Sequence, residues 1–142
     1  MSDPRNQGDL GEKLIARILE KWRDLYLING FVWAKKGGEL DFAGIDFVIV
    51  LKHHDADPHK KRGPQIFLQV KTTKNQKNIR SIIKDHLRIH PLVTLIFFIR
   101  RMPRSLNDPT ADKRLTRIEE QLKRRINNFI VSEFGGKIPV ID

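Results

Sequence analysis

Apolar and polar residues alternate along the chain with two different periods. Over residues 8–26 the apolar side chains recur every three or four positions, which is the period of an amphipathic helix. Residues 45–51 and 66–72 are short, mainly apolar and rich in β-branched and aromatic side chains, as is typical of strands. The polar segment 53–64 between them contains two prolines and a glycine. The pattern therefore predicts a helix followed by a hairpin of two strands with a long loop.

The rest of the chain extends this pattern to an α/β fold. A short strand is expected at residues 31–34, a short helix over 79–87 that ends before Pro91, and a fully apolar strand over 92–100. A last amphipathic helix is predicted over 112–131. A strand, a helix and a strand in succession imply a crossover between parallel strands. The predicted order is α-β-β-β-α-β-α, a mixed sheet flanked by helices with a C-terminal helix.

Length and composition limit the class of protein. The chain has 142 residues, with no repeat and no long linker, so one domain over residues 1–142 is expected. It contains no cysteine, which excludes disulfides and thiolate metal sites and is typical of a reducing cytosol. The first residues lack a signal-peptide pattern, and no apolar run is long enough to span a membrane. A cytoplasmic protein without a membrane partner is expected.

The charge is strongly basic and unevenly distributed. The formal net charge is +10 and the pI about 10.2. Residues 1–70 carry 11 basic and 10 acidic side chains, whereas residues 71–142 carry 16 and 7. Such an excess favours a polyanion, most often nucleic acid, although basic helix faces also serve only solubility. The candidate contacts to a nucleic-acid backbone lie after the third strand and on the last helix: Lys74, Lys77, Arg80, Lys84, Lys113, Arg114, Arg117 and Arg124.

Polar residues interrupt the apolar strands at positions that should meet. Gln69 and Lys71 are two residues apart and so share one face of their strand. Asp46 opens the preceding strand, and adjacent strand ends bring such side chains close together. Glu12 lies beside the apolar stripe of the first helix, where an unpaired charge is costly. We expect these four side chains to converge.

The chemistry of this set points to a divalent cation and a phosphate. Two carboxylates and an amide oxygen are hard ligands that suit Mg²⁺ or Mn²⁺. The carbonyl of Val70 is a further candidate ligand, which gives a metal set of Glu12, Asp46, Gln69 and Val70. A lysine beside such an ion can orient the attacking water and stabilise the charge of a phosphoryl transition state. Lys71 is the candidate for that role.

The segments GDLGEKLIARIL, GIDFVIV and QIFLQVKTT together resemble the PD-(D/E)XK nuclease superfamily. This group includes many restriction enzymes, Holliday junction resolvases and the endonuclease subunits of some transposons, and it shares an α-β-β-β-α-β core. The resemblance spans residues 8–100 and implies a restriction-endonuclease-like, Mg²⁺-dependent DNA endonuclease. Asp46 matches the conserved aspartate, Lys71 the motif lysine and Glu12 the first-helix glutamate of some branches. Gln69 replaces the usual Asp or Glu, and Ile45 replaces the proline.

Other interpretations stay open at this point. A catalytically inactive nucleic-acid-binding module, or a toxin-like or partner-binding subunit, could keep the same fold. Asp46 could cap a turn, Gln69 and Lys71 could face solvent, and Glu12 could pair with Arg17 or Arg80. Cleavage of both DNA strands would require two active sites, so a homodimer is compatible with the nuclease interpretation.

Histidines and loop carboxylates form a second set of candidates. The tract with His53, His54, His59, Asp55 and Asp57 has no fixed ligand spacing, so it is interpreted as a polar loop and not as a zinc site. His86 and His90 are four apart, but the helix is expected to end between them. His54 and His86 remain candidates for a proton shuttle or a phosphate contact. Glu39 and Asp41 could add a second metal or substitute for Asp46, but solvation in a loop is the preferred interpretation.

Overall fold

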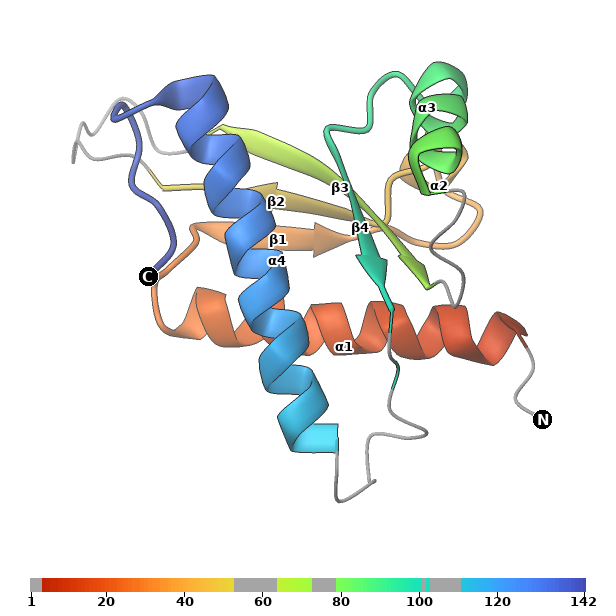
Figure 1. Cartoon of the computed structure of the whole chain (residues 1–142), viewed down its shortest axis with the longest axis horizontal. Helices are drawn as coiled ribbons and strands as arrows, with labels where there is room; N and C mark the ends of the chain where they lie inside the picture. Colours follow the sequence, from red (N-terminus) through yellow and green to blue (C-terminus); the bar gives the residue numbers. More distant parts are fainter. Residues whose placement is uncertain (1–3, 53–63, 73–78, 101, 103–110) are drawn as a thin grey trace.

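The computed structural model describes residues 4–52, 64–72, 79–100, 102 and 111–142, without the side chains of residues 4–9 and 79. Its elements are α1 (Pro4–Asp24), β1 (Gly30–Trp33), α2 (Glu39–Phe42), β2 (Phe47–Val50), β3 (Gln65–Thr72), α3 (Ile79–Ile89), β4 (Leu95–Ile99) and α4 (Ala111–Phe134) (Figure 1). The order confirms the predicted one except for α2, a single helical turn in a segment predicted as loop.

The four strands form one mixed sheet in the order β1-β2-β3-β4. β1 with β2 and β2 with β3 are antiparallel, whereas β3 with β4 is parallel. The hairpin and the parallel crossover predicted from the sequence are therefore confirmed. β4 starts at Leu95, three residues later than predicted, because Pro91 and Leu92 form a turn before the strand.

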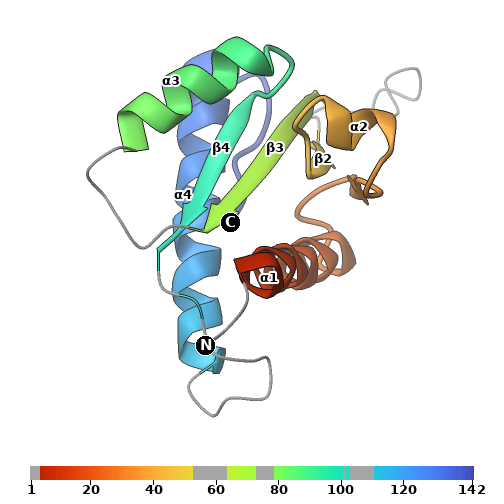
Figure 2. The same ribbon diagram turned by 90° about the vertical axis from the view of Figure 1, so that its right-hand side faces the viewer.

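Alternation along the strands separates two faces of the sheet. The face covered by α1 and α4, here called the α1 face, includes Phe47, Ile49, Leu68, Leu95 and Phe97. The face covered by α2 and α3, here called the α3 face, includes Val48, Phe67, Ile96 and Phe98. Figure 2 shows α1 and α3 on opposite sides of the β3–β4 pair. The larger core lies on the α1 face, since the buried residues of both long helices join it.

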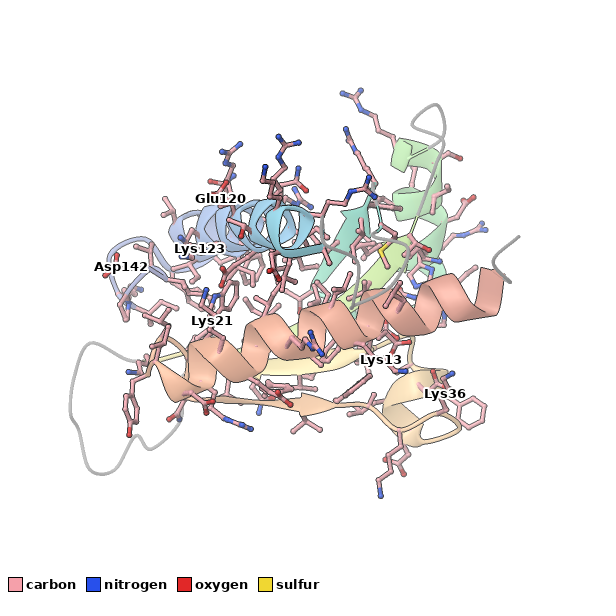
Figure 3. The ribbon with its side chains drawn as sticks, turned by 90° about the horizontal axis from the view of Figure 1, so that it is seen from below. Lys13, Lys21, Lys36, Glu120, Lys123 and Asp142 are labelled. Carbon is pink, nitrogen blue, oxygen red and sulfur yellow. The ribbon has the colours of Figure 1, made fainter. Side chains whose placement is uncertain are left out.

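The two long helices pack as their apolar stripes predict. Leu14, Leu19 and Trp22 of α1 and Leu122 of α4 are fully buried. Glu119 on α4 joins the helices, because it accepts hydrogen bonds from Trp22 Nε1 at 2.8 Å and from Lys21 Nζ at 2.9 Å. Figure 3 shows Lys21 between α1 and α4. Leu25 was predicted in the α1 stripe but is 57% exposed, because the helix ends at Asp24.

Helix α3 packs differently from its predicted stripe. Ile82 and Leu87, predicted to be buried, are 36% and 38% exposed. Ile83 is the residue of this helix that joins the apolar cluster on the α3 face. Ile83 also belongs to the predicted stripe, so the stripe is confirmed at Ile83 but not at Ile82 and Leu87. No helix in the described part of the chain is long and apolar enough to cross a membrane.

Candidate functional site

Strands β2 and β3 diverge at Asp46, and hydrogen bonds of this residue connect them there. Their pairing ends at Phe47 opposite Leu68, while β3 continues to Thr72 beside β4. The Asp46 N–H donates to the carbonyl of Leu68, and its own carbonyl accepts from the N–H of Ala34, which directly follows β1, both at 2.9 Å. The Val70 N–H, beyond the end of the β2 pairing, donates to Asp46 Oδ2 at 2.8 Å. Asp46 is thus fixed by both neighbouring strands.

Gln69 and Lys71 lie on the α3 face of β3, where they alternate with Phe67. They flank Val70, whose N–H donates to Asp46 Oδ2, so they belong to the part of β3 that contacts Asp46. The Gln69 Oε1 atom is buried and has no hydrogen-bond partner among the residues that the structure describes. A buried acceptor left unpaired costs about 1–3 kcal/mol, so such an atom needs a ligand. Gln69 and Lys71 therefore do not form a freely solvated strand face.

Glu12 reaches the same end of the sheet from α1. The helix approaches β3 closely at Gly11, where an added Cβ would lie 3.0 Å from Thr72 Cγ2. The carboxylate of Glu12 accepts a hydrogen bond from Trp33 Nε1 at 3.2 Å, and Trp33 stacks on Phe47 with a 5.6 Å centroid distance. In the described residues Glu12 forms no ion pair with the arginines considered from the sequence.

The pKa of the Asp46 carboxyl responds to the charges of other candidate residues. Burial raises the pKa of the Asp46 carboxyl from 3.8 to about 6, and the hydrogen bond from Val70 opposes this rise. The negative charges of Glu12 and Asp41 raise the pKa further, whereas Lys71 lowers it. Asp46 therefore lies within electrostatic range of Glu12 and Lys71. Its ionised form is disfavoured in the protein alone and would be favoured by a nearby cation.

The oxygen atoms at this end of the sheet fit a hard cation. In the part of the chain that the structure describes, no three His, Cys, Asp or Glu side chains gather as a metal-binding group. The proposed set contains the two carboxylates of Glu12 and Asp46. Its other two ligands, Gln69 Oε1 and the carbonyl of Val70, are neutral. That carbonyl points to the same side of β3 as the Val70 N–H, toward Asp46. Such donors suit Mg²⁺ or Mn²⁺ better than Zn²⁺.

Helix α2 brings Asp41 to the site, which the sequence analysis assigned to a solvated loop. Asp41 Oδ2 accepts a hydrogen bond from the Gly37 N–H at 2.9 Å, and this bond fixes the segment before the helix. Backbone bonds from Gly44 to Asp41 and from Ile45 to Leu40 then lead directly into Asp46. In the sequence, the closeness of Asp41 to Asp46 was the signal that both could belong to one site. The four residues of α2 are too few to show a helical period, so the helix itself could not be predicted.

His86 of α3 and His90, just after its end, also lie near this end of the sheet. The helix ends at Ile89, between them, as predicted, yet their rings are 4.6 Å apart. The reason is a backbone bond from the His90 N–H to the His86 carbonyl at 2.8 Å, which continues the turn. Burial, Lys71 and His90 lower the pKa of His86 from 6.5, so its imidazole is neutral at pH 7. The predicted helix end between the two histidines is confirmed, and the continued turn nevertheless brings their rings together.

Gly44 lets the His90 ring pack against the backbone that leads to Asp46. Its φ is +77°, and an added Cβ would lie 2.6 Å from His90 Cγ. Gly44→Ala is expected to lower the free energy of unfolding by about 2–4 kcal/mol, since it adds overpacking to left-handed strain. Gly37→Ala is a matched control: its φ is +80° but no atom lies within 4 Å of the added Cβ. Equal losses in urea unfolding would contradict the packing of His90 on Gly44.

The basic candidates fall on opposite faces of the sheet. Arg80 and Lys84 are exposed on α3, and Arg88 continues their spacing of four. Exposed positions on α4 are Lys113, Arg117 and Arg124. Arg114 is half-buried and donates to the Met102 carbonyl at 2.7 Å, so its guanidinium already has a structural partner. The candidates that lie outside the described residues are Lys74, Lys77, His53, His54, His59, Asp55 and Asp57.

Comparison with known proteins gives no relative to which this site can be matched. No family model, no curated protein and no solved structure matches the chain. The function is therefore argued from the site itself.

Proposed function

We propose that the protein is a Mg²⁺-dependent DNA endonuclease of the PD-(D/E)XK type, with a restriction-endonuclease-like core. The observation that carries the proposal is the buried Gln69 Oε1, which has no hydrogen-bond partner among the described residues, next in sequence to Val70, whose N–H donates to the Asp46 carboxylate. The order of Asp46, Gln69 and Lys71 along these two strands matches the superfamily motif. The net charge of +10 supports a polyanionic substrate.

Each residue of the site has a role in this proposal. Asp46, Gln69, Glu12 and the Val70 carbonyl would hold the ion, which would act as a Lewis acid toward a phosphate oxygen. Lys71 donates from its ammonium to the scissile phosphate and stabilises the negative charge that develops on it. Trp33 holds the Glu12 carboxylate in place through its indole N–H.

A DNA-binding module that has lost cleavage is the second candidate. A specific observation favours it: the Val70 N–H already occupies Asp46 Oδ2, and Gln69 supplies no charge. The deciding experiment incubates supercoiled plasmid with the protein and Mg²⁺ or Mn²⁺, with EDTA and Lys71→Met as controls. Cleavage that both controls abolish supports the nuclease. Open circles would indicate one active site per event, and linear plasmid the paired sites of a homodimer.

The position of the bound DNA is tested by its salt dependence. We expect contacts along Arg80, Lys84 and Arg88, because α3 lies on the face that carries Gln69 and Lys71. Replacing these three by glutamine should reduce the slope of log affinity against log salt by about 0.9 per lost contact. A control triple variant of Lys113, Arg117 and Arg124 removes the same charge from α4, on the other face. A larger change in the control would place the DNA on the α4 side.

A further inference from the structure

Residues 34–46, here called the α2 loop, leave the sheet at Asp46 and return to it. The N–H of Ala34 donates to the Asp46 carbonyl at 2.9 Å, so the two ends of the loop are bonded to each other. Inside the loop, the Gly37 N–H donates to Asp41 Oδ2 at 2.9 Å, which holds the turn against α2. The α2 loop is therefore a fixed extension of the segment that carries Asp46.

Phe42 lies on the outer side of α2. Leu40 and Ala43 pack against the apolar cluster of the α3 face and so define the inner side of this helical turn. The Phe42 side chain, between them in sequence, is 77% exposed. A single exposed ring is common on protein surfaces, so its exposure alone indicates nothing. Its position relative to the candidate site is what gives it a use.

Phe42 is held close to Asp46, on the face where a scissile phosphate would lie. The two residues are four positions apart, which limits the distance between their Cα atoms to about 14 Å. A bond from the Gly44 N–H to the Asp41 carbonyl at 3.0 Å folds this segment back and shortens the distance. Helix α2 covers the same face of the sheet as α3, the face that carries Lys71, away from α1 (Figure 2).

The surroundings of Phe42 suit the base of a nucleotide better than its phosphate. The exposed carboxylates of Glu39 and Asp41 lie on the same helical turn and repel phosphates from it. Cations for the phosphates lie nearby, since Figure 3 shows Lys13 of α1 and Lys36 of the α2 loop at the same end of the molecule. A base is uncharged, and its flat face stacks on an aromatic ring whichever base it is.

We infer that Phe42 stacks on an unpaired base next to the scissile phosphate, so that the substrate class is DNA with unpaired nucleotides at the point of cleavage. In a duplex both faces of each base are covered by the neighbouring base pairs, whereas an unpaired base can offer its face to a side chain. The inference rests on the proposed function, because it names the substrate of that site. Stacking itself requires neither metal nor cleavage and is measured separately.

The stack is tested by DNA binding in EDTA. Fluorescence anisotropy compares a labelled oligothymidylate with an abasic strand of the same length, which keeps the phosphates but has no bases. Wild-type protein should bind the oligothymidylate about tenfold more tightly, as expected for one base–aromatic stack. Phe42→Leu keeps an apolar side chain but removes the ring, so it should bind the two strands about equally. Phe42→Trp supplies another ring and should keep the preference.

Tyr26→Leu is the matched control. The Tyr26 ring is also 77% exposed, but it follows α1 and lies before β1, whereas the α2 loop follows that strand. This variant should keep the wild-type preference for the oligothymidylate. Equal affinity of the wild-type protein for the two strands, or equal losses in Phe42→Leu and Tyr26→Leu, would overturn the inference.

The substrate class has a separate readout with Mg²⁺. A duplex with an unpaired loop should be cut about tenfold faster than a fully paired duplex with the same flanking sequence, because only the first offers a base to Phe42. If the protein prefers the oligothymidylate through Phe42 but cuts neither duplex, the stack stands and the proposed nuclease fails. If it cuts both duplexes at equal rates, the nuclease stands and the inference fails.

Discussion

Asp46→Asn is expected to abolish DNA cleavage and at the same time to stabilise the fold at pH 8. The asparagine keeps an oxygen that can accept the Val70 N–H bond but removes the charge that the site disfavours. The difference between a pKa of 3.8 and one of about 6 corresponds to up to about 3 kcal/mol at high pH. A gain of about 1–3 kcal/mol is therefore expected in the free energy of unfolding.

The pH dependence of this gain has a defined sign. Below pH 3.8 the carboxyl of Asp46 is protonated in both states, so its substitution changes little. Between 3.8 and about 6 the folded state retains a proton that the unfolded state has lost, so the wild-type protein loses stability as the pH rises. Above this window the difference is constant. The gain from Asp46→Asn should accordingly grow from pH 4 to pH 7 and then level off.

Urea unfolding of both proteins at pH 4, 5, 6, 7 and 8 measures the gain. His86 acts in the opposite direction, because its lowered pKa makes the fold less stable as the pH falls below 6.5. That contribution is present in both proteins and largely cancels in the difference between them. Asp85→Asn, on the exposed side of α3, is the control and should show no such trend. A loss of stability in Asp46→Asn at pH 8 would mean that Asp46 serves the fold and not a cation.

The order of the main elements was predictable because the long helices and the strands have strong hydrophobic periods of their own. The α1 stripe, the apolar β4 and the turn signals around Pro91 act locally, so the order and the mixed sheet follow from the sequence alone. Alternation also placed Gln69 and Lys71 on one face correctly. These features depend on neighbours in sequence or on paired strand ends.

The remaining features of the site depend on contacts between distant segments. The inner side of α3 could not be predicted, because the polar face below it favours His86 and His90 over Ile82 and Leu87. The hydrogen bond from Trp33 to Glu12 joins residues that are 21 positions apart, and the local sequence around either residue does not predict it. Asp41 enters through a helix of four residues, too short to leave a period in the sequence.

Gln69→Glu is expected to give the largest change in metal binding. The substitution replaces a neutral amide oxygen by a third carboxylate in the proposed metal site. Mg²⁺ affinity should rise about tenfold, which adds about 1.4 kcal/mol to the stabilisation by saturating Mg²⁺. Without metal the variant should be less stable than the wild type, because like charges are then held together. Thermal unfolding with and without Mg²⁺ measures both effects.

Gln65→Glu is the matched control, since it makes the same substitution at the exposed, opposite end of β3. Mg²⁺ should stabilise this control no more than the wild type. Equal stabilisation of all three proteins would mean that Gln69 is not a ligand. If Mg²⁺ stabilises only Gln69→Glu, and that variant alone nicks plasmid, then the amide is what prevents metal binding in the natural chain. The DNA-binding module without cleavage would then be the better account, because a single amide in place of a carboxylate would separate it from an active nuclease.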